Sequence, residues 1–339
     1  MDLRLSIEQE ELVGAFAAMY GRHATPERVR AAEPRGFDES LWGRLVEMGV
    51  PAMGVDEAQG GWGATMLDLA LIAEQHGRHV APAPLVEALV AARLLARCGA
   101  PAEGLLDAAL SGRTLVTVAV RPAGDGRATL VPAGGVADTA LVVDGDRLLA
   151  VPLAGARTEV ENLGALPLAD VAVGGSAEVI AVGSAARDAS EHAIDEWLAL
   201  TSAALVGLGA RALEIGVDYA KERRAWGVPI GTFQAVSHPL ADGATALDGA
   251  RLLSYEAAWA AAEDPGRASE LAAMAGAFAY ETARDVTYHS LHVHGGYGFM
   301  MEYDVQLYWR RARAWANVFG DAGTMYGRAA DARYGAVAG

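Results

Sequence analysis

The feature that most restricts the fold is the recurrence of apolar side chains at helical spacing in the second half of the chain. Steps of three and four residues place one set on a single stripe of a long helix leading up to Arg223. The set is Leu198, Thr201, Leu205, Leu208, Ala212, Ile215 and Tyr219. Two more helices are predicted at 239–262 and from 268 to about 292. Three long antiparallel helices predict a helical bundle over 188–339.

The segments before this bundle show two other sequence patterns, one helical and one β-prone. Residues 1–112 read as further helices, with Ser6 as an N-cap before an acidic first turn. From Thr114 the chain shows short β-prone runs separated by Gly, Asp and Pro, at 115–120, 140–143 and 148–151. These runs predict a small antiparallel β domain over 113–187. The predicted class is α+β, with N-terminal helices, a shortened middle β domain and a C-terminal bundle.

The composition of the chain argues against a nucleic acid partner, a membrane span and secretion. The 339 residues carry 27 Lys plus Arg against 43 Asp plus Glu, and a formal charge of -16 would repel a nucleic acid backbone. The sequence contains no run of about twenty uninterrupted apolar residues, the length that a membrane span requires. The N-terminus lacks the basic start and apolar core of a secretory signal, and Cys98 is the single cysteine. We expect a cytoplasmic protein that binds neither nucleic acid nor membrane.

One segment, residues 219–236, carries a cluster of cations beside an aromatic side chain. A helix ends at Arg223 and Arg224, Trp226 follows, the chain turns, and a helix restarts after Gln234. Arginine can give paired hydrogen bonds to phosphate oxygens, and a tryptophan offers a flat face for stacking. The plainer interpretation is that the arginines only satisfy the C-terminal carbonyls and dipole of the helix. Composition alone favours the plainer interpretation.

A second segment, residues 292–299, contains adjacent glycines. Gly295 and Gly296 would let the backbone come close to a ligand. His292 and His294 suggest a metal site, but no carboxylate or cysteine accompanies them at a ligand spacing. We therefore predict no metal site.

Together these segments resemble the acyl-CoA dehydrogenase family. Residues 223–227 with 229–231 and 233–235 are similar to its Arg-x-x-Phe-Gly, Pro-Ile and Phe-Gln signature, and residues 294–299 are similar to its second, glycine-rich signature. Residues 36–38 with 41–42, 60–63 and 74–78 resemble its N-terminal helical domain in order and spacing. The resemblance covers most of the chain and implies an acyl-CoA dehydrogenase-like fold.

The resemblance also implies a cofactor, FAD, and an acyl-CoA substrate. In the family the nucleotide half of FAD lies on the helical domain of a neighbouring subunit, whereas the flavin ring lies on the β domain of its own subunit. The matching positions here are Arg223 for the pyrophosphate, Trp226 beside it, Gln234 on the adenine side, and Gly295 and Gly296 for close backbone approach. The family usually has Gln where this chain has His292, which can still donate a hydrogen bond.

The flavin cradle and the catalytic base of the family have no match in this sequence. The family's Thr-Glu-Pro and Gly-Ser-Asp stretches correspond to 118–126, where neither stretch occurs. The family's catalytic glutamate falls, in one version, at Phe319 before Gly320. In the other version it falls at Trp197, so Glu196 is displaced by one residue, or about 100° around a helix.

Loss of the ring cradle and base with retention of the nucleotide half predicts a divided site. A longer acyl-CoA dehydrogenase subunit would supply the flavin ring site and the glutamate, in an α2β2 heterotetramer like those of the actinobacterial enzymes that act on steroid side-chain CoA thioesters. An electron-transferring flavoprotein would be the acceptor. Two alternatives stay open: a self-sufficient homo-oligomer with Glu196 or Glu302 as base, and a flavin-free assembly subunit.

Overall fold

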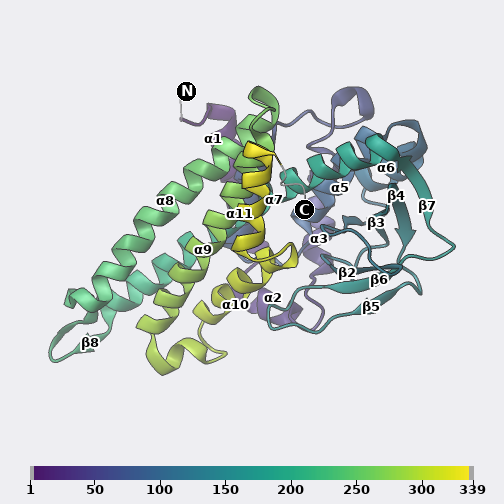
Figure 1. Cartoon of the computed structure of the whole chain (residues 1–339). Coiled ribbons are helices and arrows are strands. Elements are labelled where there is room, and N and C mark those ends of the chain that lie inside the picture. The colour runs from purple at the N-terminus through teal and green to yellow at the C-terminus, as the bar shows by residue number, and fades with distance from the viewer. Residues whose placement is uncertain (1–3, 336–339) are drawn as a thin grey trace. The chain divides into compact units, whose positions relative to one another are not determined.

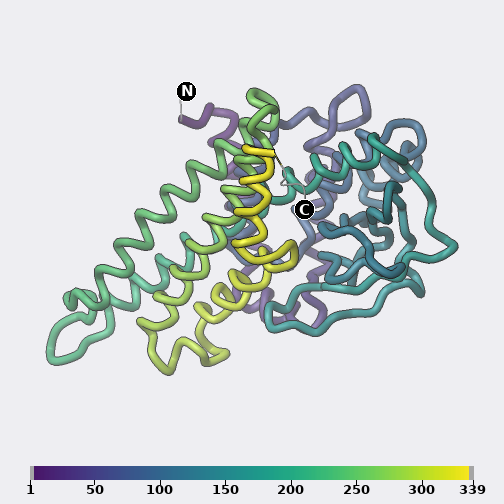
Figure 2. The backbone as a smooth tube through the Cα atoms, in the orientation of Figure 1, coloured from purple at the N-terminus to yellow at the C-terminus, as the bar shows by residue number. Residues whose placement is uncertain are grey.

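The computed structural model describes residues 4–335 (Figures 1 and 2). These residues divide into two compact units. The first unit is built from the described residues of Met1–Pro26, Ala70–Ala81 and Ala199–Gly339. The second is built from Glu27–Leu69 and Pro82–Leu198. Helices α4 (Met66–Arg78) and α7 (Gly183–Glu222) contribute residues to both units. The division of the sequence at 112 and 187 describes the order of elements, and as a set of domains it stays a prediction.

The second unit combines short helices with two small sheets. Its helices are α2 (Pro26–Ala32), α3 (Glu39–Glu47), α5 (Leu85–Cys98) and α6 (Glu103–Leu110), with 3-10 turns η1 (Val50–Ala52), η2 (Glu57–Gln59) and η3 (Ala100–Ala102). Its strands are β1 (Val116–Val118), β2 (Arg127–Val131), β3 (Thr139–Asp144), β4 (Arg147–Pro152), β5 (Arg157–Glu159), β6 (Ala169–Ala172) and β7 (Glu178–Val182). Helix α5 is the core of this unit because most of its side chains are apolar and buried.

The two sheets have the orders β1-β3-β4-β7 and β2-β6-β5. The predicted strands at 115–120, 140–143 and 148–151 are found as β1, β3 and β4. The prediction of a purely antiparallel arrangement was wrong, because β1 pairs with β3 in parallel register. The chain between them contributes β2 to the other sheet, and this crossover brings β3 back in the same direction as β1.

The first unit is a bundle of long helices. It contains α1 (Ile7–His23), α8 (Gln234–Glu263), α9 (Ala268–Val293), α10 (Val305–Trp315) and α11 (Ala322–Tyr334), together with the C-terminal parts of α4 and α7. Helices α8 and α11 pack against α9 (Figure 1). Short elements connect the helices: β8 (Arg224–Ala225), β9 (Val228–Pro229), η4 (Ile230–Thr232), η5 (Gly295–Phe299) and η6 (Ala316–Val318). The fold thus agrees with the predicted class, including the bundle and the small β sheets.

Two helix ends show how local chemistry sets the boundaries. Ser6 caps α1 as predicted, and Gln9 completes a reciprocal capping box. Helix α8 begins at Gln234, five residues before the predicted start at Pro239, so Pro239 lies inside the helix. Proline can occupy an interior helical position at the loss of one backbone hydrogen bond. The predicted start at residue 239 was therefore too late, whereas the restart expected after Gln234 lies at the observed boundary.

Helix α7 is long and apolar enough by composition to cross a membrane, and among the described residues it alone meets that test. Of its most apolar stretch, 72% is buried inside the protein. A helix that is apolar on most sides is expected when it lies in a protein core.

A buried histidine in α4 makes the first unit sensitive to acid. His76 is 5% exposed and shares a hydrogen bond of 3.1 Å with the Tyr20 hydroxyl. Burial, assisted by the nearby His79, lowers the pKa of His76 to about 3. The unfolded chain would take up a proton below about pH 6.5, whereas the folded chain would not. Stability contributed by the neutral ring is therefore lost as the pH falls.

We expect this one group to lower the free energy of unfolding by about 2 kcal/mol between about pH 7 and about pH 5. Urea titrations at the two pH values, compared between the wild type and His76→Asn, measure the difference. The variant should lose that part of the pH dependence, whereas His238→Asn, a surface change in the same unit, should keep it. Equal pH dependence in His76→Asn and the wild type would contradict the assignment.

Candidate functional site

The β8–β9 hairpin presents an exposed tryptophan in an unfavourable conformation. Trp226 has φ +50° and Gly227 has φ +82°, so both turn residues are left-handed. The Trp226 side chain is 91% exposed and touches Phe233 edge to face at 5.7 Å. A left-handed backbone and an exposed indole both cost free energy. Such a residue is expected where a ligand or another chain covers it.

The two arginines of the cluster have different roles. Arg224 donates to the carbonyl oxygen of Gly227 at 3.1 Å and so closes the hairpin turn. The Arg223 side chain is exposed and forms no hydrogen bond or ion pair with any residue between 4 and 335. The plainer interpretation, in which Arg223 satisfies helix carbonyls, therefore fails for this side chain. Its guanidinium group is available to an anion from outside the chain.

Gln234 is the first residue of α8, a helix of 30 residues. Its side chain is exposed, and no side chain caps the helix at Phe233. The free amides and the dipole at such an N-terminus favour a negatively charged group. Arg223 and the start of α8 are brought together because Ile230 donates its backbone N–H to the Arg223 carbonyl oxygen at 2.8 Å.

The glycine pair in η5 has no packing reason to be glycine. A Cβ atom at Gly295 or at Gly296 would meet no atom of residues 4–335 within 4 Å. Gly295 has φ +60°, which explains glycine there, but Gly296 has no such strain. The space that a side chain at Gly296 would fill is open to a molecule outside this chain. This is the fit expected of a site that needs close backbone approach.

The two histidines of the glycine-rich segment are separated by the structure. His292 is exposed on the last turn of α9, where its ring stacks on Tyr288 at 5.8 Å. His294 is 5% exposed, and its Nδ1 shares a hydrogen bond of 2.7 Å with the Ser290 carbonyl oxygen. The described residues contain no group of three metal-ligating side chains.

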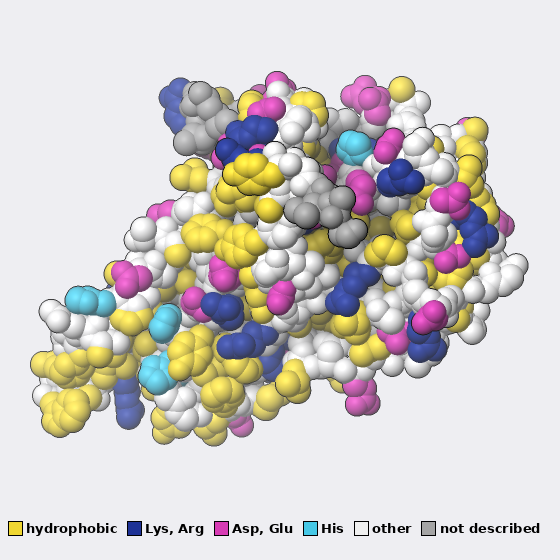
Figure 3. All heavy atoms as spheres, viewed as in Figure 1, with side chains coloured by type: hydrophobic (Ala, Val, Ile, Leu, Met, Phe, Trp, Pro, Cys, Tyr) yellow, Lys and Arg dark blue, Asp and Glu magenta, His cyan; other side chains and the backbone are white. Residues whose placement is uncertain are grey.

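The arginine segment and the glycine segment meet at one end of the bundle. Tyr219, one turn before Arg223, stacks on His294 with ring centres 4.1 Å apart and planes 25° apart. Hydrophobic side chains gather at this end, over the hairpin that projects at the lower left of Figure 3. The exposed ones in these segments are Trp226, Val228, Tyr297, Phe299, Met300 and Met301. We call this exposed region the ledge; it includes Arg223, Trp226, Gln234, His292, Gly295 and Gly296.

In the second unit, the segment that corresponds in sequence to the family's flavin cradle has several of its polar groups paired within the chain. The Thr117 hydroxyl donates to the Pro132 carbonyl oxygen at 2.5 Å and is fully buried. The backbone N–H groups of Ala119 and Ala123 donate to strand β3. Val118, Ala119 and Val120 bury apolar side chains. This strand therefore offers little to a flavin ring.

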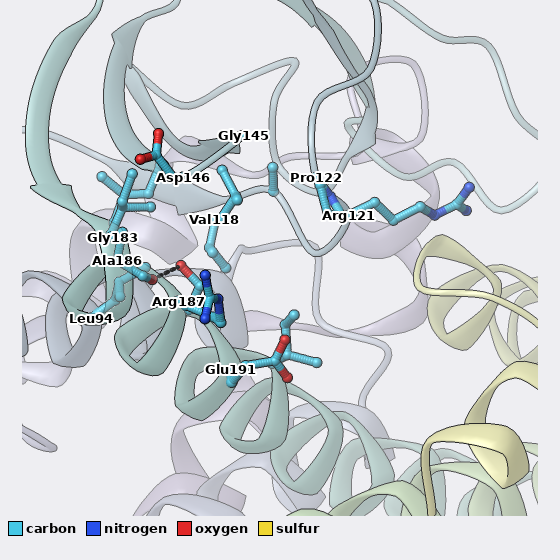
Figure 4. A pocket seen from close by; sticks show the side chains of 16 residues that line it. Leu94, Val118, Arg121, Pro122, Gly145, Asp146, Gly183, Ala186, Arg187 and Glu191 are labelled. Carbon is cyan, nitrogen blue, oxygen red and sulfur yellow. Dashed lines mark hydrogen bonds between the residues drawn. The ribbon is translucent and has the colours of Figure 1, made fainter. Parts of the chain in front are cut away.

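A pocket beside this strand is narrow and mostly apolar (Figure 4). Strands β1, β3 and β4 and the first turns of α7 line it, with Leu94 of α5. Its volume is about 90 Å³. Ligand pockets usually have about 300 to 1,000 Å³. Arg121 extends away from the other lining side chains (Figure 4). The pocket has no room for a flavin ring or an acyl chain.

Glu196, the candidate base, is held in a buried ion-pair cluster. Its side chain is 5% exposed, and its Oε1 lies 2.8 Å from Arg93 Nη2 and 2.6 Å from Arg97 Nη2. Arg93 also donates to the carbonyl oxygen of Gly54. Burial alone would raise the pKa of Glu196, but the two guanidinium groups outweigh it and hold that pKa below its ordinary value. A carboxylate paired in this way is a poor proton acceptor.

Two of the other candidate positions, Trp197 and Phe319, carry no carboxylate. Trp197 is 2% exposed, and Phe319 is an apolar side chain after η6. Asp321 is close to it in sequence, but its carboxylate caps α11 by accepting from Thr324 N. Glu302 lies exposed in the loop before α10.

Sequence reasoning missed one titratable group in the second unit, Glu87 of α5. Burial raises its pKa to about 6, although a backbone hydrogen bond acts in the opposite direction. A glutamate within the apolar run of α5 is a signal that could have marked it.

Comparison with known proteins identifies the family of this chain. The family models described as acyl-CoA dehydrogenase N-terminal domain and acyl-CoA dehydrogenase C-terminal domain match residues 6–103 and 192–332. The chain is 31% identical over 322 residues to the acyl-CoA dehydrogenase IpdE2 of Mycolicibacterium smegmatis, covering 93% of this chain and 96% of that protein.

Two solved structures are also similar. A chain of the ChsE4-ChsE5 complex from Mycobacterium tuberculosis matches with a TM-score of 0.90 and 28% identity, over 100% of both chains. A chain of a Tcur3481-Tcur3483 steroid ACAD variant matches with a TM-score of 0.86 and 29% identity, over 96% of this chain and 97% of that one. From its sequence and its fold, this chain belongs to the acyl-CoA dehydrogenase family of oxidoreductases.

Proposed function

We propose that this chain is one subunit of a heteromeric FAD-dependent acyl-CoA dehydrogenase and that it holds the nucleotide half of the cofactor. The observation that carries the proposal is the ledge itself, where an unpaired Arg223, an exposed Trp226 and an open Gly296 face outward. A longer acyl-CoA dehydrogenase subunit supplies the flavin ring site and the catalytic glutamate. The narrow pocket near β1 and the paired Glu196 support this division.

Each residue of the ledge has a defined task. The Arg223 guanidinium donates to diphosphate oxygens, and the N-terminus of α8 adds positive potential. Trp226 covers the nucleotide with its ring face, Gln234 offers an amide to the adenine side, and His292 offers an imidazole N–H. Gly295 and Gly296 let the backbone approach. Bound FAD supplies hydride acceptance during α,β-dehydrogenation of the thioester.

The similar proteins support a heteromeric enzyme that acts on a steroid side-chain thioester. One solved relative is a complex of two named proteins, ChsE4 and ChsE5, and another is titled a steroid ACAD with two named components. We therefore propose an α2β2 heterotetramer with a steroid side-chain CoA thioester as substrate. Electrons then pass to an electron-transferring flavoprotein.

The test is to produce this chain with a longer acyl-CoA dehydrogenase subunit of the same organism and to measure flavin retained by the complex. Arg223→Ala should weaken FAD binding about 10- to 100-fold, because a charged pair of hydrogen bonds to phosphate is lost. Visible absorbance after dialysis against increasing salt measures the retained flavin.

The matched control is Arg22→Ala, which removes another exposed arginine from the last turn of a helix, α1. It should leave FAD retention unchanged. If Arg223→Ala retains as much FAD as the wild-type complex, the ledge does not hold the cofactor and the chain is an assembly subunit. A yellow, dehydrogenating homo-oligomer formed by this chain alone would overturn the proposal in favour of a self-sufficient enzyme.

A further inference from the structure

The ledge is built from two chain segments that lie far apart in the sequence. Arg223, Trp226 and Gln234 lie between the end of α7 and the start of α8, whereas Gly295 and Gly296 follow α9. A diphosphate held from both sides needs a fixed distance between them, because hydrogen-bond distances tolerate only a few tenths of an ångström. Some contact between α7 and α9 must set that distance.

Two contacts one turn apart join these helices near the ledge. Gly216 of α7 lies against Ser290 of α9, and a Cβ atom on Gly216 would come within 3.0 Å of Ser290 backbone and side-chain atoms. Tyr219 of α7 then stacks on His294 at 4.1 Å. Glycine lets the helices approach closely, and the aromatic pair fills the space one turn nearer to the ledge.

The imidazole of His294 is fixed on several sides. Its Nδ1 bonds to the Ser290 carbonyl oxygen at 2.7 Å, which orients the ring on the last turn of α9. Tyr303 meets it edge to face at 6.0 Å, and Tyr303 stacks in turn on Tyr297 of η5 at 5.5 Å. A continuous set of ring contacts therefore runs from α7 to the glycine-rich turn. His294 is 5% exposed and Tyr219 is half-buried, so the pair lies beneath the ledge.

We infer that Tyr219 and His294 are positioning residues, which set the separation of Arg223 from the Gly295 and Gly296 backbone without touching the nucleotide. This inference rests on the proposed function, since it explains what keeps the two segments of the ledge at the separation that the nucleotide needs. Tyr219 acts through Arg223, which follows one helical turn later. His294 acts through Gly295, its neighbour in the chain.

The test is a double-mutant cycle on FAD binding to the assembled complex. Tyr219→Leu removes the ring and should weaken FAD binding roughly three- to tenfold, the equivalent of one aromatic pair. Tyr219→Phe keeps the ring and should bind FAD as the wild type does. The double variant Tyr219→Leu with Arg223→Ala should bind FAD no more weakly than Arg223→Ala alone. The losses are not additive because Tyr219 affects FAD binding only through the position of Arg223. A residue with only a structural role would give additive losses.

A second variant keeps the test decisive if Tyr219→Leu does not fold. Gly216→Ala pushes α7 away from α9 at a buried point and should weaken FAD binding while the complex still assembles. Additive losses in the cycle, or unchanged FAD binding in both Tyr219→Leu and Gly216→Ala, would overturn the inference. If Arg223→Ala also leaves FAD binding unchanged, the proposed function fails instead, so the two failures are distinguishable.

Discussion

Replacing Arg93 with alanine is expected to lower the free energy of unfolding by about 3 kcal/mol, because it removes one of the two arginines that neutralise a buried carboxylate. Glu196 would keep Arg97, but that side chain is the more exposed of the two arginines, at 32% against 18%. The carbonyl oxygen of Gly54 would lose its donor in the same step. Chemical denaturation at neutral pH measures the loss.

The control for Arg93→Ala is Arg187→Ala, which removes an exposed arginine from the first turns of α7. It should change the free energy of unfolding by less than about 0.5 kcal/mol. Arg93→Ala combined with Glu196→Gln should recover part of the loss, because the buried charge is removed with its partner. If Arg93→Ala is no worse than Arg187→Ala, the cluster does not stabilise the second unit.

The same cluster decides whether Glu196 acts in catalysis. Glu196→Gln keeps the size of the side chain and should retain dehydrogenase activity per assembled complex within a few-fold. A catalytic base replaced by an amide loses activity by factors of about a hundred or more. A loss of that size in an otherwise stable complex would restore Glu196 as the base and would contradict the divided site.

The second large effect is expected where α4 crosses α7 in the first unit. A Cβ on Gly77 would lie 1.8 Å from the Ala204 carbonyl oxygen, and a Cβ on Gly207 would lie 1.9 Å from the Glu74 carbonyl oxygen. Both obstacles are backbone atoms, which cannot rotate away. We expect Gly207→Ala to lower the free energy of unfolding by about 3 kcal/mol, the upper range of overpacking. Thermal and urea unfolding measure it.

The sign of this result is informative because alanine normally stabilises a helix relative to glycine by about 0.5 to 1 kcal/mol. Gly14→Ala in α1 provides the comparison, since a Cβ there would meet nothing within 4 Å. That variant should become slightly more stable. If Gly207→Ala also gains stability, the two helices do not cross as closely as the structure has them.

Much of the fold could be predicted from the sequence because helix formation depends on near neighbours. The stripe from Leu198 to Tyr219 lies in a single helix, and β1, β3 and β4 lie where β-prone runs were found. The parallel pairing of β1 with β3 could not be predicted, since pairing depends on the path of the whole β segment. The predicted start of α8 at Pro239 lay five residues too late, because proline is uncommon inside a helix and no side-chain cap marks the true start after Phe233.

The sequence by itself determined the helices, the glycine pair and the arginine cluster, because each depends on residues within a few positions of one another. Only the tertiary structure decided what those residues can do. The Arg223 side chain has no partner among the described residues, whereas Arg224 closes a turn. Glu196 is neutralised by arginines 103 and 99 positions away in the chain. The charge state of a side chain, its burial and the space around it depend on the residues that pack against it, which are often distant in the sequence. Spacing along the chain therefore locates a side chain without fixing its pKa or its availability.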